Sequence, residues 1–360
     1  MEIYALDKEF KLVSIGIPFT NLQWNRRYYE CGDFEMQLSI NDYDPSWAYI
    51  GTNARPELGM AQKLQITGVG DTSMLVSGFF CEKMLDDKVC YPKWKSSTKE
   101  DVGVPQYEYI GAENIARQAF LQFKKGIPVE LGTNTNLAPD FRDTTTFEDS
   151  QLGEALYSFL ETFEMSYRVG YDYLSDDLTF RVWQGVDRTS AQNENGWQVF
   201  SSDFGNLAGK TVDIDESGYK NYAIIPIMYG SDNEYNGETL YLDKSDGGYK
   251  KELLIDRSAD FPDEYTTEAQ FKESVLQDAA EELATYDIVE SIDIQVIGNE
   301  GYMTDYDLGD KCDIELSDIG VTTDSRIVEI NEVFKPEDYH SVTIGLGNKR
   351  IDNIRRAVRR

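Results

Sequence analysis

The chain has 360 residues, with 65 Asp and Glu, 34 Lys and Arg and one histidine. Its 41% hydrophobic and 12% aromatic content is typical of folded protein and is sufficient for two or three domains. The net charge of −31 excludes binding to the outside of nucleic acid through phosphate contacts and disfavours anionic membrane surfaces. Two interpretations remain: a charge that serves solubility, or an acidic channel wall that a polyanion passes without sticking.

The four cysteines, Cys31, Cys81, Cys90 and Cys312, have no CxxC spacing, which argues against a zinc site. We expect buried free thiols, which suits assembly in a reducing cytoplasm. The first residues show no secretion signal, and no apolar run approaches the ~18 residues of a membrane span. These features predict a soluble protein without a membrane span.

Residues 1–107 are predicted to form a first tube-like β domain. From Phe34 to Ile40 apolar and polar residues alternate, which is the period of a half-buried strand. Gly32 and Asp33 mark a turn before it.

Residues 108–190 are predicted to form a small inserted α+β domain. Apolar residues at helical spacing indicate helices over 112–125 and 147–163, and two strands follow at 165–173 and 178–183. Gly126 and Pro128 are typical of the end of the first helix.

Residues 191–348 are predicted to be a second β region that contains a tube-like domain and can share strands with 1–107. Residues 191–206 resemble a linker, and Pro226 places the apolar strand 222–229 at an edge or bulge. A hairpin is expected over 230–250. A helix over 268–286 is indicated by the capping pair Thr267 and Gln270. The predicted fold class is therefore α+β, mostly β: two tube-like β-barrel or sandwich domains, an inserted small α+β domain and a further helix.

A short pattern occurs twice. Glu57-Leu58-Gly59 precedes the strand-like segments 63–66 and 74–76, and Asp307-Leu308-Gly309 precedes 312–316 and 326–330. Both copies read as acidic-Leu-Gly, strand, turn, strand, which indicates two copies of one β-rich unit. Three chains with two such units each can build a pseudo-sixfold ring.

Signatures of catalysis are sparse. A catalytic triad would need His340, which we interpret as a surface or loop residue. The acidic clusters 243–248 and 305–310 have oxygen ligands for calcium but lack an EF-hand pattern, so solvated turns are the favoured interpretation. No catalytic residue, cofactor or metal is predicted.

Residues 349–360 form a basic C-terminal tail with six Lys and Arg. Ile351, Ile354 and Val358 fall at helical spacing, so the tail is either a short amphipathic helix that docks on a partner or a solvated, frayed end. An acidic surface on a neighbouring subunit would attract it. The candidate partner-binding residues, chosen on charge alone, are Arg355, Arg356, Arg359 and Arg360.

Residues 22–38, with Trp24-Asn25-Arg26-Arg27-Tyr28 followed by a Gly-containing turn and Phe34-Glu35-Met36, resemble the opening of siphophage tail hub proteins. Similar motifs stand at 185–189, 199–201, 206–207, 308–311 and 326–330. This family is related to the baseplate hub of contractile phages and to the hub part of tail-associated lysins. The motifs are spread over most of the chain, in the family's order and spacing.

The resemblance implies a homotrimeric structural hub at the tail tip of a bacteriophage, assembled in the host bacterial cytoplasm. It implies that the hub joins the tail tube, distal tail protein and tape-measure protein to a tip fibre or receptor-binding protein. The hub would also line the channel through which DNA passes during ejection without specific binding. Unlike longer relatives, the chain is expected to carry no peptidase or fibre domain after the second β unit, which puts any lytic activity in doubt. We therefore expect that the protein is not an enzyme.

A second hypothesis is a glycan-binding module or glycosidase of the tail tip that takes part in host attachment. It predicts a monomer with exposed aromatic residues beside a carboxylate pair, and Trp94, Trp183 and Trp197 are the first candidates. A third, a peptidoglycan peptidase, is disfavoured by the single histidine and the missing metal-ligand spacing.

Overall fold

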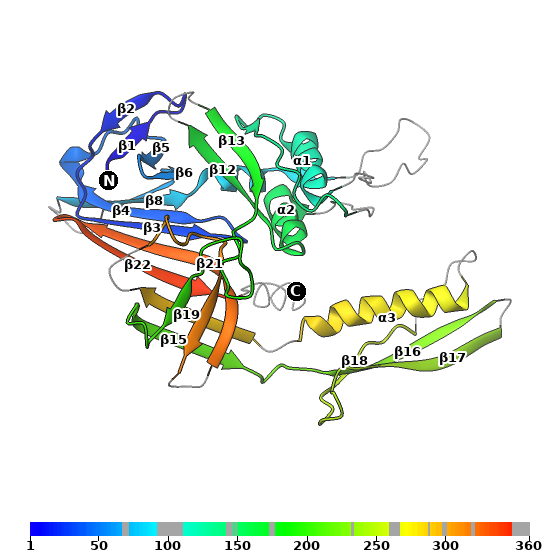
Figure 1. Ribbon diagram of the computed structural model, residues 1–360. Coiled ribbons are helices and arrows are strands. Elements are labelled where there is room, and N and C mark those ends of the chain that lie inside the picture. Colours follow the sequence, from blue (N-terminus) through cyan, green and yellow to red (C-terminus); the bar gives the residue numbers. More distant parts are fainter. Residues whose placement is uncertain are drawn as a thin grey trace, which may run out of the picture. The chain divides into compact units, whose positions relative to one another are not determined.

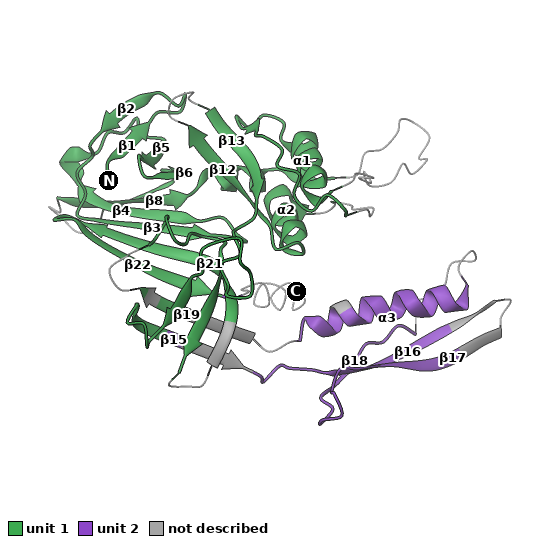
Figure 2. Ribbon diagram, in the orientation of Figure 1, with its two compact units in different colours: residues 1–210, 293–346 green, residues 211–292, 347–360 purple. Residues whose placement is uncertain are grey.

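The structure of the chain is a computed structural model. It describes residues 1–66, 72–91, 111–141, 147, 150–172, 177–231, 234–258, 267–286, 289–296, 301–317 and 321–347. The chain divides into two compact units, which Figure 2 shows in different colours. Unit 1 comprises residues 1–210 and 293–346, and unit 2 comprises residues 211–292 and 347–360.

Unit 1 contains a seven-stranded sheet in the order β10-β13-β12-β6-β5-β1-β2 (Figure 1). Its strands are β1 (Ile3–Leu6), β2 (Leu12–Ile15), β5 (Tyr49–Thr52), β6 (Arg55–Met60), β10 (Glu130–Leu131), β12 (Ser166–Asp172) and β13 (Asp177–Trp183). The β12–β13 hairpin joins this sheet where Gly170 pairs with Glu57 of β6.

A ten-stranded sheet contains the path β15-β19-β22-β21-β3-β4-β8-β7, to which β14 and β20 are added beside β21. Its strands are β3 (Asn21–Arg27), β4 (Asp33–Ser39), β7 (Lys63–Gln65), β8 (Ser73–Phe79), β14 (Val199–Ser201), β15 (Leu207–Asp215), β19 (Val289–Val296), β20 (Lys311–Leu316), β21 (Val321–Lys335) and β22 (Tyr339–Leu346). The antiparallel pair β3–β21, with Trp24 opposite Glu332, joins strands from the two ends of the chain.

The helices of unit 1 are α1 (Ala112–Phe123) and α2 (Leu152–Glu161), with the 3₁₀ helices η1 (Ile40–Asp42) and η2 (Cys81–Asp87). The first predicted helix is confirmed, but the second begins five residues later than 147. Ser150 and Gln151 instead form β11 (Ser150–Gln151), which pairs with β9 (Val89–Cys90). Pairing with a distant strand overrides the local helical pattern there.

Two apolar cores of unit 1 can be followed in the described residues. One lies between the two sheets and contains Trp24, Phe34 and Met36 from the ten-stranded sheet with Ile3 and Ile50 from the seven-stranded sheet. The other packs α1, α2 and η2 against the β12–β13 hairpin. Alternation along β3 and β4 gives each strand one buried face, so the period-two prediction for residues 34–40 is confirmed.

Unit 2 is a three-stranded sheet, in the order β17-β16-β18, with one long helix along one face (Figure 2). Its elements are β16 (Tyr222–Ser231), β17 (Glu234–Asp243), β18 (Glu252–Leu254) and α3 (Glu268–Ala284). Phe271, Val275, Ala279 and Leu283 of α3 pack on Ala223, Ile225 and Ile227 of β16. The predicted helix and its capping box at Thr267 are confirmed.

Three expectations need correction. Within the expected linker 191–206, β14 pairs in parallel with β20. The hairpin expected over 230–250 spans 222–243 instead. Pro226 lies on the central strand of unit 2, not on an edge. The Pro226 carbonyl accepts a hydrogen bond from Arg257 N, on the β18 side of the strand. The N–H that Pro226 lacks would point to the same side, where the pairing with β18 has already ended at Leu254.

The mostly β, α+β fold class is confirmed. Among the residues that the structure describes, no helix is long and apolar enough to cross a membrane.

The cap of α3 yields a stability prediction. Replacement Thr267→Ala removes the side-chain oxygen that accepts from Gln270 N, and we expect a loss of about 1 kcal/mol in the free energy of unfolding. Urea unfolding measures it. The control Ser274→Ala, at an exposed position inside the same helix, should be neutral or slightly stabilising. Equal losses in the two variants would contradict the role of the cap.

Candidate functional site: a buried arginine between two copies of one motif

Arg26 lies at an inward position of β3, in register with the buried Leu22 and Trp24. Its side chain is only 2% exposed, although it carries a full charge. A buried charge without partners destabilises a fold strongly, so the groups around Arg26 have to compensate it.

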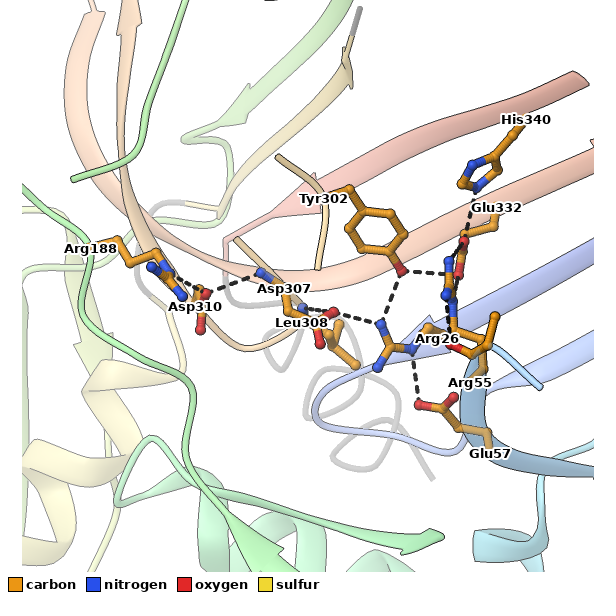
Figure 3. A network of polar contacts seen from close by, with 11 residues as sticks. Arg26, Arg55, Glu57, Arg188, Tyr302, Asp307, Leu308, Asp310, Glu332 and His340 are labelled. Carbon is orange, nitrogen blue, oxygen red and sulfur yellow. Dashed lines mark hydrogen bonds and ion pairs between the residues drawn. The ribbon is translucent and has the colours of Figure 1, made fainter. Parts of the chain in front are cut away.

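The two copies of the repeated motif supply these groups (Figure 3). Arg26 Nε donates to Glu57 Oε1 at 2.9 Å, and its Nη1 donates to Asp307 Oδ1 at 2.6 Å. These are the acidic residues of the first and the second acidic-Leu-Gly motif. One arginine therefore links both copies, although 250 residues separate them in the sequence.

The leucines and glycines of the motif also have matching roles. Leu58 and Leu308 are both buried. A Cβ atom on Gly59 would lie 2.3 Å from the ring of Phe34, and one on Gly309 would lie 2.4 Å from the ring of Tyr28. In each copy the acid binds Arg26, the leucine enters a core, and the glycine lets an aromatic ring approach the backbone.

The two copies differ in their backbone. Glu57-Leu58-Gly59 lies within strand β6, whereas Asp307-Leu308-Gly309 lies in the loop before β20. Both are followed by an antiparallel strand pair, β7–β8 in the first copy and β20–β21 in the second.

A second charged cluster continues from Arg26 through Tyr302 (Figure 3). Arg26 Nη1 donates to the Tyr302 hydroxyl at 3.0 Å, and this hydroxyl donates to Glu332 Oε1 at 2.9 Å. Glu332, which is fully buried, also accepts a two-point contact from Arg55. His340 Nε2 lies 3.0 Å from Glu332 Oε2, and its ring stacks on Phe334. The expectation of a surface or loop histidine is therefore wrong, because His340 is a half-buried member of β22.

The electrostatics follow from these contacts. Burial by itself raises the pKa of Glu332, but the hydrogen bonds from Arg55 and His340 outweigh it and lower the pKa to about 2. For Arg26 burial acts in the opposite direction and by itself lowers the pKa. The charges of Glu57 and the other acidic neighbours outweigh it and raise the pKa well above the ordinary value. Both groups are held in their charged forms.

The second motif copy is also tied to residues 185–189. Arg188 Nε donates to Asp310 Oδ2 at 2.6 Å, and Val186 N donates to Asp310 Oδ1 at 2.7 Å. The backbone of Gly185 touches that of Gly309 so closely that a Cβ would lie 1.9 Å from the Gly309 carbonyl oxygen. Two segments that carry the sequence resemblance are thus in direct contact.

A small cavity lies beside Arg26. Glu57, Glu82, Arg168 and Trp183 are among the residues that line it. One buried carboxylate oxygen of Glu57 and one of Glu82 have no hydrogen-bond partner. Burial raises the pKa of Glu82 to about 7, against the hydrogen bond that its carboxylate accepts from Val169 N.

The charged groups of the site stabilise the fold by pairing with one another. Arg26, Glu57, Asp307 and Glu332 are engaged with one another, and within the described ranges no group of three or more His, Cys, Asp or Glu side chains could hold a metal ion. In the acidic cluster 243–248, Asp243 accepts from Ser245 and pairs with Lys250, the geometry of a solvated turn. In the cluster 305–310, Asp307 and Asp310 are occupied by arginines.

Of the three tryptophans in the glycan hypothesis, the structure describes Trp183 and Trp197. Trp183 packs edge-on against Tyr28, and Trp197 is 57% exposed with its Nε1 donating to Gln192 O. Trp94 and the candidate partner-binding residues Arg355, Arg356, Arg359 and Arg360 lie outside the described residues. The sequence analysis did not predict that Arg26 pairs with Glu57 and Asp307. The feature that could have indicated it is a charged residue at an inward position of an alternating strand.

Comparison with known proteins places the chain in a family. Residues 114–348 match the siphovirus ReqiPepy6 Gp37-like proteins, and the chain belongs to that family. No curated protein sequence matches significantly.

Solved structures share the fold over nearly the whole chain. A tail protein from Neisseria meningitidis MC58 superposes with a TM-score of 0.57 at 10% identity, over 97% of both chains. The 43 kDa tail protein of prophage MuSo2 from Shewanella oneidensis has a TM-score of 0.54 at 14% identity, over 98% of this chain and 99% of that one. The prophage tail protein gp18 from Listeria monocytogenes EGD-e has 0.52 at 13% identity, over 99% and 97%. The fold is thus that of phage tail proteins, and the family recognised from the sequence is confirmed.

The buried arginine yields a second prediction. Replacement Arg26→Met leaves the buried Glu57 and the partly exposed Asp307 without their cation, and we expect a loss of about 3–5 kcal/mol in the free energy of unfolding. Denaturant unfolding measures it. The control is Arg27→Met, the next residue of β3, whose half-buried side chain pairs with carboxylates on the opposite face. It should cost about 1 kcal/mol or less, and similar losses in both variants would refute the role of Arg26.

The raised pKa of Glu82 yields a third prediction. Because the folded state favours its neutral form, the stability that Glu82 contributes is complete below about pH 4.5 and is lost as pH rises through about 7. Glu82→Gln should therefore be more stable than the parent above pH 7 and show a flatter profile from pH 4.5 to 8. The exposed control Glu9→Gln should keep the parent profile, and an unchanged slope in Glu82→Gln would contradict the assignment.

Proposed function

We propose that this protein is a structural component of a bacteriophage tail that acts without catalysis, as the hub of the tail tip. Three copies would form a ring that joins the tail tube, the distal tail protein and the tape-measure protein to a fibre or receptor-binding protein. The family and the phage-tail fold support a place in the virion tail. Assembly would take place in the host cytoplasm, before attachment and DNA ejection.

The observation that carries the proposal is the duplication centred on Arg26. Two strand pairs with the same leading motif, one from residues 1–107 and one from 191–348, belong to one ten-stranded sheet. Two equivalent wall segments in each copy give six in a trimer, which is how a trimer can match a sixfold tube. Residues 108–190 would be an insertion outside that wall.

The face of β3 and β4 that points away from the Trp24 core suits a DNA channel. It carries Gln23, Asn25, Glu35 and Gln37, which are half-buried or exposed. On these two strands the cation of the face, Arg27, is paired with Asp33 and Glu329. Amides and carboxylates do not retain phosphates as free lysines and arginines do, so DNA would slide past. This agrees with the large negative charge of the chain.

The oligomeric state tests the ring. We expect light scattering, over a range of protein and salt concentrations, to give the mass of a trimer, and negative-stain images of the same sample to show a central hole. A subunit contact of the expected kind buries more than ~1,000 Å². A strict monomer, both alone and after mixing with isolated tail tubes, would contradict the hub.

A further inference from the structure

The sheet of unit 2 has two apolar faces, and α3 covers one of them. The other, here called the outer face, follows from the register. Ile224 pairs with Tyr241 on β17 and with Leu254 on β18, and paired residues share a face. Its apolar side chains are those of Tyr222, Ile224, Pro226, Met228, Tyr241 and Leu254, and Asp243, Thr239 and Glu252 share the face at paired positions.

These side chains are accessible. Tyr241 is 58% and Leu254 is 64% exposed, and the four residues of β16 are half-buried. A sheet that is packed on one side only normally alternates apolar with polar residues. Six apolar side chains on the uncovered face therefore indicate that another element packs there.

The acidic residues around the outer face favour a basic segment as its binding partner. Residues 211–292 contain 20 Asp and Glu against six Lys and Arg. At one end of the face, Lys250 Nζ lies 3.9 Å from the centre of the Tyr222 ring and 2.8 Å from Asp243 Oδ2. An aromatic ring beside a carboxylate thus already holds one cation there, the combination that also binds arginine.

The C-terminal tail, residues 349–360, has the matching properties. It contains six cations and one carboxylate, Asp352, so its charge is opposite to that of residues 211–292. Ile351, Ile354 and Val358 would share one side of a helix. Twelve helical residues span ~18 Å, similar to the ~23 Å of the seven strand residues 222–228.

We propose that the outer face of unit 2 binds the basic tail, residues 349–360, of a neighbouring copy of this protein. Ile354 and Val358 would pack on Tyr241 and Leu254, while the arginines would reach the surrounding carboxylates. Each copy offers one face and one tail, so the contact is head-to-tail and closes into a ring when the rotation allows it. The inference rests on the assembly of copies proposed above and names the surface that receives the tail.

A binding experiment on full-length protein tests the face. The variant Ile354→Asp/Val358→Asp keeps the outer face and impairs its own tail. A fluorescent peptide of residues 348–360 should bind it with an affinity that falls as salt rises. Adding Tyr241→Asn and Leu254→Asn should weaken binding by at least ~10-fold, whereas adding Leu64→Asn, at an exposed strand position in unit 1, should leave it unchanged. A peptide of scrambled sequence that binds equally well would overturn the proposal.

Mixing identifies the donor of the tail. The tail variant and the face variant Tyr241→Asn/Leu254→Asn should each associate less than the parent in light scattering, and their mixture should regain association. If the parent protein does not bind the peptide even when it is diluted to a monomer, then its own tail occupies the outer face. This outcome would overturn the proposal. A tail variant that forms the complete ring and does not bind the peptide would also refute it, while leaving the hub intact.

Discussion

A guanidinium group that is almost completely buried controls how unit 1 is put together. Arg26 cannot be accommodated by either half of the chain alone, because each motif copy supplies a single carboxylate to it, Glu57 from one and Asp307 from the other. With one carboxylate partner, most of the five N–H donors of the buried guanidinium would lack an acceptor. Both copies together satisfy more of these donors, so the buried arginine couples segments that are distant in sequence.

The neighbouring interactions reinforce this coupling. Glu332 stands opposite Trp24 in the β3–β21 pair, and it is held by Arg55 from β6 and by His340 from β22. Tyr302 connects this cluster to Arg26. The polar network thus spans both sheets of unit 1 at the point where the N-terminal and C-terminal strands meet. Such a network fixes one register, because a slip by one residue would turn Arg26 and Glu332 toward solvent.

Unit 2 follows a different principle. It has a capped helix, a short core and a sheet whose outer face exposes Tyr241 and Leu254. Exposed aromatic side chains are of the kind that interfaces use. In the proposed assembly, unit 1 would supply the channel wall and unit 2 a docking surface. This division of labour suits a protein that works by assembling with others.

The sequence by itself determined the mostly β composition, helices α1 and α3 with the Thr267 cap, the alternating strands and the duplicated motif, because all of these depend on residues within a few positions of one another. It also identified the family, through motifs at 22–38, 185–189 and 308–311. Only the tertiary structure decided that the two copies of the duplicated motif meet at Arg26, that Ser150 and Gln151 are strand and not helix, that His340 is paired, and that Pro226 lies on a central strand. Each of these depends on a partner distant in sequence: Asp307 for Arg26, Cys90 for Ser150, Glu332 for His340 and the end of β18 for Pro226. Periodicity reports which face of an element is buried, but it carries no information about what that face will meet.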